Sequence, residues 1–202
     1  MRLGILGGTF NPPHLGHLIC AQEACVQLEL DRVMLVPALV PPHKPVEDEP
    51  GPRHRLELCR LAVQDDERLV VSDLEIRRQP PSFTVDTLEQ LTREAPERNL
   101  FLIVGGDIAA GLPEWHEPER VLSLATVAVA ERRGTPRVAV DDALTRVEAR
   151  ERAQFFPMPT VDISSTLVRE RVRAGQPIRY LVPDAVERYI RDKGLYAGGS
   201  GA

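Results

Sequence analysis

The first seventeen residues, Met1–His17, read MRLGILGGTFNPPHLGH and decide the fold on which the rest of the chain builds. Arg2–Leu6 is short and apolar enough to be a buried strand. The two glycines that follow lack a Cβ atom, so the backbone there can turn sharply and come close to a ligand. The paired prolines suit the entrance of a helix, where a missing N–H group costs nothing.

A helix is predicted directly after this turn, because Leu15–Leu30 carries apolar residues at helical spacing. A strand, a glycine turn and a helix start together form an anion site, since free backbone N–H groups and the positive end of the helix dipole point at one place. His14 and His17 would add two donors on one face of that entrance. We therefore expect phosphates to bind here; the structural alternative is that both histidines only cap or pack the helix entrance.

Composition limits the partners of the chain. Its 202 residues suffice for one large domain with a full core, and 43% of them are apolar and 27% charged. No apolar stretch is long enough to span a bilayer, and the net charge of −5 favours neither nucleic acid nor a membrane surface. The three cysteines, Cys20, Cys25 and Cys59, lack the spacing of a metal site, which predicts buried thiols in a reducing cytoplasm and no metal-binding residues. A homo-oligomer is left open.

Apolar runs alternate with amphipathic stretches along the chain. Further strands are predicted at Val33–Val36, Leu69–Val71, Phe101–Val104, Thr126–Ala130 and Gln154–Phe156. Helices are predicted at Leu56–Val63, Val85–Arg93, Glu117–Leu124, Asp141–Arg150, Leu167–Ala174 and Asp184–Lys193. This alternation predicts an α/β fold, a doubly wound, Rossmann-like parallel sheet with helices on both faces. Ligands are then expected at the carboxyl ends of the strands, near the point where the strand order reverses.

We expect a single domain over residues 1–196, with a C-terminal helical extension at about 163–196, and a flexible tail at 197–202. Residues 38–52 are rich in proline and form a predicted loop. That loop includes Pro-Pro-His-Lys at 41–44, whose Lys44 could swing onto a phosphate.

A second phosphate-binding stretch is Ile163-Ser-Ser-Thr-Leu-Val-Arg169, which opens a helix with hydroxyl groups. Arg169 would lie one turn on, over the same face as Ser165 and Thr166, where it could hold the outer phosphates of a triphosphate. The alternative is a capped helix with a surface arginine.

Three residues elsewhere have one functional and one structural interpretation each. Asp107 follows a predicted strand and could accept hydrogen bonds from a ribose, or it could be an ordinary turn residue. Trp115 could offer a flat face to a ring or belong to the core. Thr84, in Ser-Phe-Thr-Val-Asp-Thr-Leu at 82–88, could border a ligand or only cap a helix.

The run Gly-Gly-Thr-Phe-x-Pro-x-His-x-Gly-His resembles the nucleotidyltransferase superfamily with the T/H-x-G-H motif, and the stretch at 163–169 resembles the I-S-S-T-x-x-R motif of its adenylyltransferase branch. With the pieces at 41–44, 82–88 and 105–107, the chain from Met1 to Tyr196 resembles the bacterial nicotinate mononucleotide adenylyltransferases of NAD synthesis. Small departures are Asn11, Phe83 and Gly106, where that family more often has Asp, Tyr and Ala.

The resemblance implies an enzyme that joins nicotinate mononucleotide to the AMP part of ATP, giving nicotinate adenine dinucleotide and pyrophosphate, with Mg²⁺ between phosphate oxygens. It implies catalytic roles for His14, His17, Lys44 and Arg169. It implies ATP binding by Gly7, Gly8, Thr9, Phe10, His17, Gly105, Asp107, Ile163, Ser164, Ser165, Thr166 and Arg169. It implies mononucleotide binding by Thr9, Lys44, Thr84 and Trp115.

Three alternatives stay open at this point. The acceptor could be nicotinamide mononucleotide, because sequence alone does not show the donors that distinguish a carboxylate from an amide. The chain could also be a phosphopantetheine adenylyltransferase of the same fold. In another class, it could be a nucleotide-binding sensor that has lost catalysis.

Overall fold

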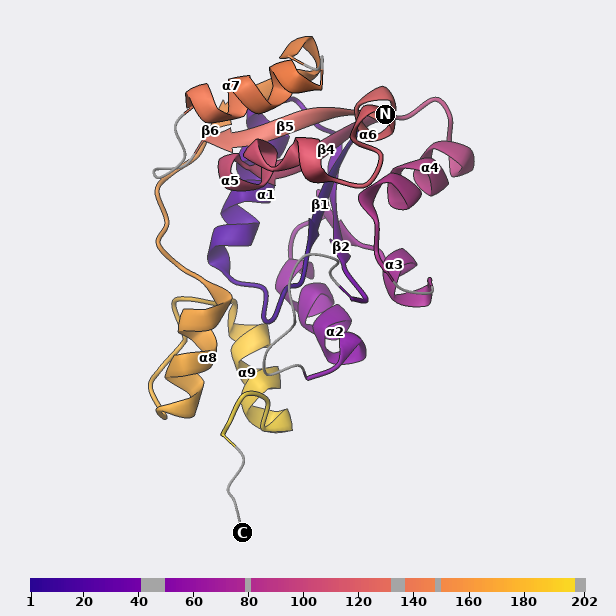
Figure 1. Cartoon of the computed structure of the whole chain (residues 1–202). Helices are drawn as coiled ribbons and strands as arrows, with labels where there is room; N and C mark the ends of the chain where they lie inside the picture. Colours follow the sequence, from indigo (N-terminus) through magenta and orange to yellow (C-terminus); the bar gives the residue numbers. More distant parts are fainter. Residues whose placement is uncertain (41–49, 79–80, 132–136, 148–149, 199–202) are drawn as a thin grey trace.

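The computed structural model describes residues 1–40, 50–78, 81–131, 137–147 and 150–198. Its centre is a six-stranded, all-parallel sheet in the order β3-β2-β1-β4-β5-β6. The strands are β1 Arg2–Gly8, β2 Arg32–Pro37, β3 Leu69–Val71, β4 Asn99–Gly105, β5 Ala125–Glu131 and β6 Ala153–Pro157. The order reverses between β1 and β4, so the sheet is doubly wound as predicted (Figure 1).

Helices cover both faces of the sheet (Figure 1). The described helices are α1 Leu15–Gln27, α2 Pro52–Val63, α3 Leu74–Arg77, α4 Thr84–Glu94, α5 Gly106–Ala110, α6 Pro118–Leu124, α7 Arg137–Arg146, α8 Ser165–Arg173 and α9 Asp184–Lys193, with 3-10 turns η1 Leu112–Glu114 and η2 Arg150–Arg152. Helices α1 and α2 share a core with one face, while α3 to α7 share a second core with the other. Of the helices described, none has the length and apolar character needed to cross a bilayer.

Side chains along β1 point alternately to the two faces of the sheet and so contribute to both cores. Leu3 and Ile5 enter the core beneath α4 to α7, and Leu6 enters the core beneath α1 and α2. Gly4 faces the same core as Leu6, where a Cβ atom would come within 2.8 Å of the side chains of Ile103 and Val33. The strand needs a glycine at this position because side chains of the neighbouring strands β2 and β4 pack directly against its backbone.

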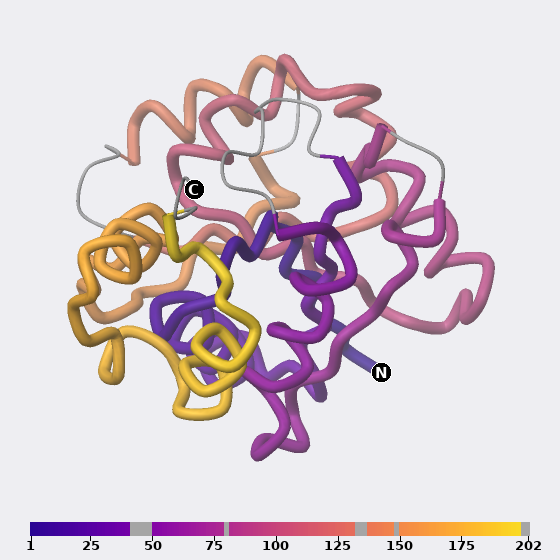
Figure 2. Tube along the Cα trace, turned by 90° about the horizontal axis from the view of Figure 1, so that it is seen from below, coloured from indigo at the N-terminus to yellow at the C-terminus, as the bar shows by residue number. Residues whose placement is uncertain are grey.

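The C-terminal helices form a third core with α2. Val168 of α8, Val186 and Ile190 of α9, and Leu58 of α2 are almost fully buried together. Viewed from below, α8 and α9 lie beside α2 and the indigo start of the chain (Figure 2). The extension thereby places the stretch at 163–169 next to the first seventeen residues.

Several predicted helices differ from the structure in their bounds; the one predicted at Leu56–Val63, for example, begins at Pro52. The helix predicted at Leu15–Leu30 ends at Gln27, because the chain turns at Glu29, whose φ of 48° is left-handed. The prediction at Asp141–Arg150 is wrong in its position, since the helix spans Arg137–Arg146. The sequence places a proline just before that helix, and this proline is a start signal because proline suits the first turn of a helix. The short helices α3 and α5 were not predicted.

Candidate active site

A cavity of about 530 Å³ opens at the carboxyl ends of β1 and β4, where the strand order reverses. Twelve of the predicted site residues line it: Gly7, Gly8, Thr9, His14, His17, Thr84, Gly105, Asp107, Trp115, Ile163, Ser164 and Ser165. They come from β1, α1, α4, β4, α5 and α8 and from the connections beside them. The structure thus brings these twelve residues together around one cavity, which is the candidate site.

His14 and His17 form one unit at the start of α1. Their ring centroids lie 3.8 Å apart, and the backbone N–H of His14 donates to Nδ1 of His17 at 3.1 Å. An imidazole that accepts at Nδ1 carries its proton on Nε2, so the outer nitrogen of His17 is a donor even in the neutral ring. The pair therefore caps the helix and also lines the cavity, so capping leaves the phosphate-binding interpretation open.

Phe10 and Gly16 set the position of these rings. Phe10, only 2% exposed, has a left-handed φ of 50° and meets the ring of His17 edge-on, with centroids 5.0 Å apart. A Cβ atom at Gly16 would lie 3.0 Å from Nδ1 of His14, and one at Gly8 would lie 3.1 Å from the Phe10 ring. Gly8 and Gly16 are therefore favoured because aromatic rings occupy the space that a side chain would take, whereas Gly7 has open space around it.

The two motifs, about 150 positions apart, meet at the loop before α1. The hydroxyl of Ser165 donates to the carbonyl of Pro12 at 2.8 Å, and Nη1 of Arg169 donates to the carbonyl of Asn11 at 2.9 Å. Ser164 caps α8, since its Oγ accepts from the backbone N–H of Leu167 at 3.1 Å. The C-terminal extension thus holds the phosphate-binding loop directly.

Four predicted site residues lie behind the lining of the cavity or outside the described residues. Arg169 is 7% exposed and does not line the cavity, because its guanidinium reaches back to the Asn11 carbonyl. Phe10 and Thr166 also lie behind the lining residues. Lys44 falls outside the part of the chain that the structure describes.

Aromatic side chains close the opposite side of the cavity. Phe83, directly before α4, stacks on His116 with ring centroids 4.3 Å apart, and Trp115 lines the cavity beside them. Sequence analysis did not select His116. These rings offer flat, largely apolar surfaces of the kind on which a heteroaromatic ring stacks.

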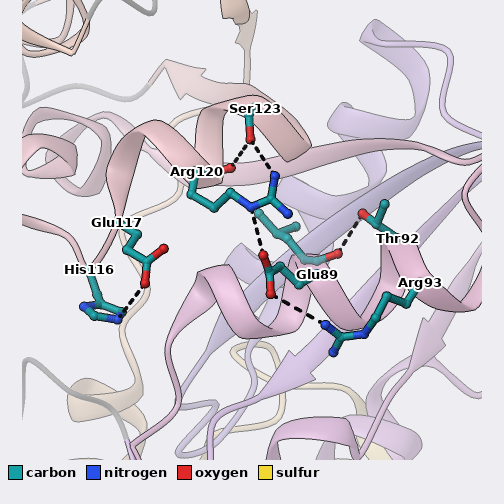
Figure 3. A network of polar contacts seen from close by, with 8 residues as sticks. Glu89, Thr92, Arg93, His116, Glu117, Arg120 and Ser123 are labelled. Atoms are coloured by element: carbon teal, nitrogen blue, oxygen red, sulfur yellow. Dashed lines mark hydrogen bonds and ion pairs between the residues drawn. The ribbon is translucent and has the colours of Figure 1, made fainter.

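Helices α4 and α6 support these aromatic residues. Nε of Arg120 on α6 lies 2.8 Å from Oε1 of Glu89 on α4, and Arg93 approaches the same carboxylate at 3.6 Å (Figure 3). His116 reaches Glu117 at 3.3 Å in the same view. The carboxylate of Glu89 therefore joins α4, whose first residue Thr84 lines the cavity, to α6, which begins shortly after the cavity-lining His116.

Glu75 is a buried carboxylate of this wall that the sequence did not single out. It is 7% exposed, lines the cavity and accepts a hydrogen bond from Oγ1 of Thr87 at 2.7 Å. Burial raises the pKa of the Glu75 carboxyl group, and the hydrogen bonds from Thr87 and Ser82 and the nearby Arg78 oppose that rise. Its position two residues into α3 gave no pattern by which sequence could identify it.

Among the described lining residues of the cavity, the charged or titratable side chains are Glu75, Asp107, Cys20 and three histidines. The starts of α1, α4 and α8 also border it, through His17, Thr84 and Ser165. Donors for an anion at such a site would be imidazole N–H groups and the backbone N–H groups of a helix start.

The chain matches the cytidylyltransferase-like family over residues 5–171. Two curated relatives bear the name probable nicotinate-nucleotide adenylyltransferase. The protein of Synechococcus sp. strain JA-3-3Ab is 45% identical over 200 residues, covering 96% of this chain and 94% of the relative. The protein of Roseiflexus sp. strain RS-1 is 46% identical over 197 residues, covering 96% and 97%.

A solved structure has the same fold. The nicotinic acid mononucleotide adenylyltransferase of Plasmodium falciparum, solved in complex with NaAD, superposes with a TM-score of 0.78 over 96% of this chain and 97% of its own. Sequence identity is 17%, so this likeness concerns the architecture.

Proposed function

The chain belongs to the cytidylyltransferase-like family, and we propose that it transfers the adenylyl group of ATP to nicotinate mononucleotide. The products are nicotinate adenine dinucleotide and pyrophosphate. The chain is a nicotinate-nucleotide adenylyltransferase of NAD synthesis, as its full-length relatives at 45 and 46% identity are named. ATP is its co-substrate.

One observation carries the assignment of the site. The loop before α1 and the start of α8 meet through the 2.8 Å bond between Ser165 and Pro12, at the mouth of the cavity where β1 and β4 end. Both stretches resemble phosphate-binding motifs of the adenylyltransferases. Their meeting supports a single site for the triphosphate.

The reaction needs positioning and charge stabilisation more than acid–base chemistry, because the attacking phosphate oxygen is already an anion near neutral pH. We assign His17 as the donor to the α-phosphate, since it lines the cavity and the His14 N–H bonded to its Nδ1 places the ring proton on Nε2. His14 and the backbone amides from Gly8 to Phe10 support the same phosphates. Arg169 acts from behind, by holding the Asn11 carbonyl of that loop.

Lys44 is proposed to draw the two phosphate groups together, by the resemblance of its motif. Mg²⁺ would neutralise charge on the leaving pyrophosphate, held by phosphate oxygens and water, because it gives up its water reluctantly. Of the two carboxylates that line the cavity, Glu75 is buried and bonded to Thr87, and Asp107 is on the exposed side. Asp107 is therefore the carboxylate that can approach a hydrated ion or a ribose.

The two ends of the cavity suit the two substrates. Gly105, Asp107 and Ile163 are proposed to border the adenosine. Thr84 and Trp115 are proposed to border the pyridine ring, with the first N–H groups of α4 facing its carboxylate.

The first test measures pyrophosphate release with ATP, Mg²⁺ and each acceptor in turn: nicotinate mononucleotide, nicotinamide mononucleotide and phosphopantetheine. We expect the highest kcat/KM with nicotinate mononucleotide. A higher value with either of the other acceptors would replace the proposed substrate. Binding of ATP with no release for any acceptor would identify a nucleotide sensor.

A second test separates the two roles of His17. His17→Asn keeps an acceptor near Nδ1 for the His14 N–H but has no donor at Nε2, so the helix start should survive. We expect turnover to fall on the order of 10²–10³-fold, corresponding to about 2.7–4 kcal/mol for one lost transition-state donor. Unchanged turnover in a variant that unfolds at the wild-type temperature would remove His17 from the mechanism.

Cytoplasmic location is proposed because the enzyme draws on the ATP pool, and fractionation of cells would check it. Assembly into a homo-oligomer stays a prediction, for which light scattering gives the mass directly.

A further inference from the structure

Arg55 on α2 is a fully buried cation with 0% exposure. Its guanidinium makes two hydrogen bonds to backbone carbonyls in two different connections of the fold. Nη1 donates to Thr9 at 2.8 Å, and Nη2 donates to Leu39 at 3.1 Å. Taking a charge out of water is costly and is offset by well-placed hydrogen bonds, to which these two bonds contribute.

Both carbonyls belong to segments that shape the cavity. Thr9 lines it, directly after the glycine turn of β1. Leu39 follows Ala38, which also lines the cavity and whose N–H donates to the Gly8 carbonyl at 3.0 Å. The two guanidinium nitrogens of Arg55 therefore join the segment after β1 to the segment after β2, beside the cavity.

Leu39 and its neighbour Val40 are hydrogen-bonded to Ser82, which lies just before α4 on the side of the cavity proposed for the acceptor. The backbone N–H of Leu39 donates to Oγ of Ser82 at 3.1 Å, and the N–H of Ser82 donates to the Val40 carbonyl at 3.4 Å. The Ser82 hydroxyl is hydrogen-bonded to the carboxylate of Glu75, which also accepts from Thr87 on α4. A continuous run of polar contacts thus leads from the phosphate turn to the helix that begins at Thr84.

We propose that Arg55 is a positioning residue that fixes the nucleotide half of the site relative to the acceptor half, by holding Thr9 and Leu39 together and acting through Ser82. This inference rests on the proposed function, because it takes the two ends of the cavity as the sites of the two reactants. Arg55 does not line the cavity and touches neither substrate site directly.

The expected kinetic signature follows from the geometry of transfer. The attacking oxygen and the α-phosphorus must lie about 3–3.5 Å apart and in line, and a displacement of about 1 Å can cost on the order of 10²-fold in rate. Each half keeps its own contacts to its own substrate when the two halves shift against one another. Loss of the connection should therefore lower kcat and leave both KM values nearly unchanged.

Arg55→Lys is the informative variant. It keeps the positive charge and most of the buried stem, but an ammonium is a compact donor without the planar fork that reaches two carbonyls at once. Arg55→Met removes both donors and leaves two carbonyls without them, so it also tests folding. Arg60 supplies the control on the same helix, because its side chain is 54% exposed and pairs only loosely with Glu57 at 3.7 Å.

For Arg55→Lys we expect kcat, corrected for the folded fraction, to fall roughly 10- to 100-fold with each KM within about threefold of wild type. The unfolding temperature should fall by about 2–12 °C, because a buried hydrogen bond is lost. Arg60→Lys and Arg60→Met should behave as wild type. A wild-type kcat in Arg55→Lys, or a loss that only follows the folded fraction measured by circular dichroism, overturns the proposal. A rise confined to one KM overturns it as well.

A double-mutant cycle tests the route through Ser82. If Arg55 and Ser82 act in one chain, Arg55→Lys combined with Ser82→Ala should lose about as much kcat as the more damaging single variant. Losses that multiply would refute a shared route. The wild-type enzyme in the same assay distinguishes failure of the proposed function from failure of this inference. No product from nicotinate mononucleotide refutes the proposed function. An active wild type with an unaffected Arg55→Lys refutes only this inference.

Discussion

Tyr196 offers a sharp test of how the end of the chain supports the phosphate loop. Its ring is 8% exposed, and its hydroxyl donates to Oδ1 of Asn11 at 2.7 Å. Asn11 is 4% exposed, and its carbonyl accepts from Arg169. Tyr196→Phe keeps the ring and removes only the hydroxyl, so the change isolates one buried hydrogen bond across 185 positions of sequence.

The magnitude follows from burial. Removing one partner of a buried hydrogen bond costs about 1–3 kcal/mol, because the other partner loses its donor without regaining water. That range corresponds to a factor of about 5 to 150 in the folding equilibrium. For a chain of this length it lowers the unfolding temperature by about 2–12 °C.

Thermal and urea unfolding of Tyr196→Phe provide the assay, with Tyr180→Phe as the matched control. The side chain of Tyr180 is 81% exposed, so its variant should stay within about 0.5 kcal/mol of wild type. We also expect Tyr196→Phe to lower kcat, because Asn11 precedes the proline pair that leads into the histidines. Equal stability and equal kcat in the two variants would refute the claim that the C-terminal extension holds this loop.

Two further predictions concern the cores of the two faces. Burial raises the pKa of Glu75, so the folded state keeps this proton to a higher pH than the unfolded chain, and its contribution to stability declines as pH rises above the ordinary glutamate range of about 4.3. In urea titrations, the free energy of unfolding of Glu75→Gln should therefore increase relative to that of wild type as the pH rises. A difference that does not depend on pH would contradict the assignment. Gly4→Ala should lower the free energy of unfolding by about 1–3 kcal/mol, since the added methyl group would meet core side chains at 2.8–2.9 Å. Unchanged urea unfolding would show that the core side chains move aside without cost.

Much of the sheet could be predicted because its strands are short apolar runs between turn signals. Phe101 and Val127 lie in strands that the structure extends by only one or two residues at each end. The site could be located for the same reason, since the carboxyl ends of parallel strands meet at one edge. The position of α7 was wrong because its entrance is marked by a single proline, which competes with several polar residues downstream.

Residues that act from behind the cavity were harder to predict. Arg55 has two other arginines on its helix, and nothing in residue type tells which one is buried. Spacing held a usable signal, because Leu58 and Cys59 lie three and four positions on and share its face. Arg169 shows the converse, since a motif identifies the residue but leaves open whether the guanidinium meets the ligand or the loop that holds it.

The two interpretations of the histidine pair turn out to be complementary. A helix start leaves backbone N–H groups without partners, and the His14 N–H finds one in Nδ1 of His17. That same bond fixes which nitrogen of His17 carries the proton, and hence which donor faces a phosphate. Local helix capping therefore sets the chemical state of the group assigned to catalysis, and a side chain without a second ring nitrogen could satisfy the cap but could not supply the donor.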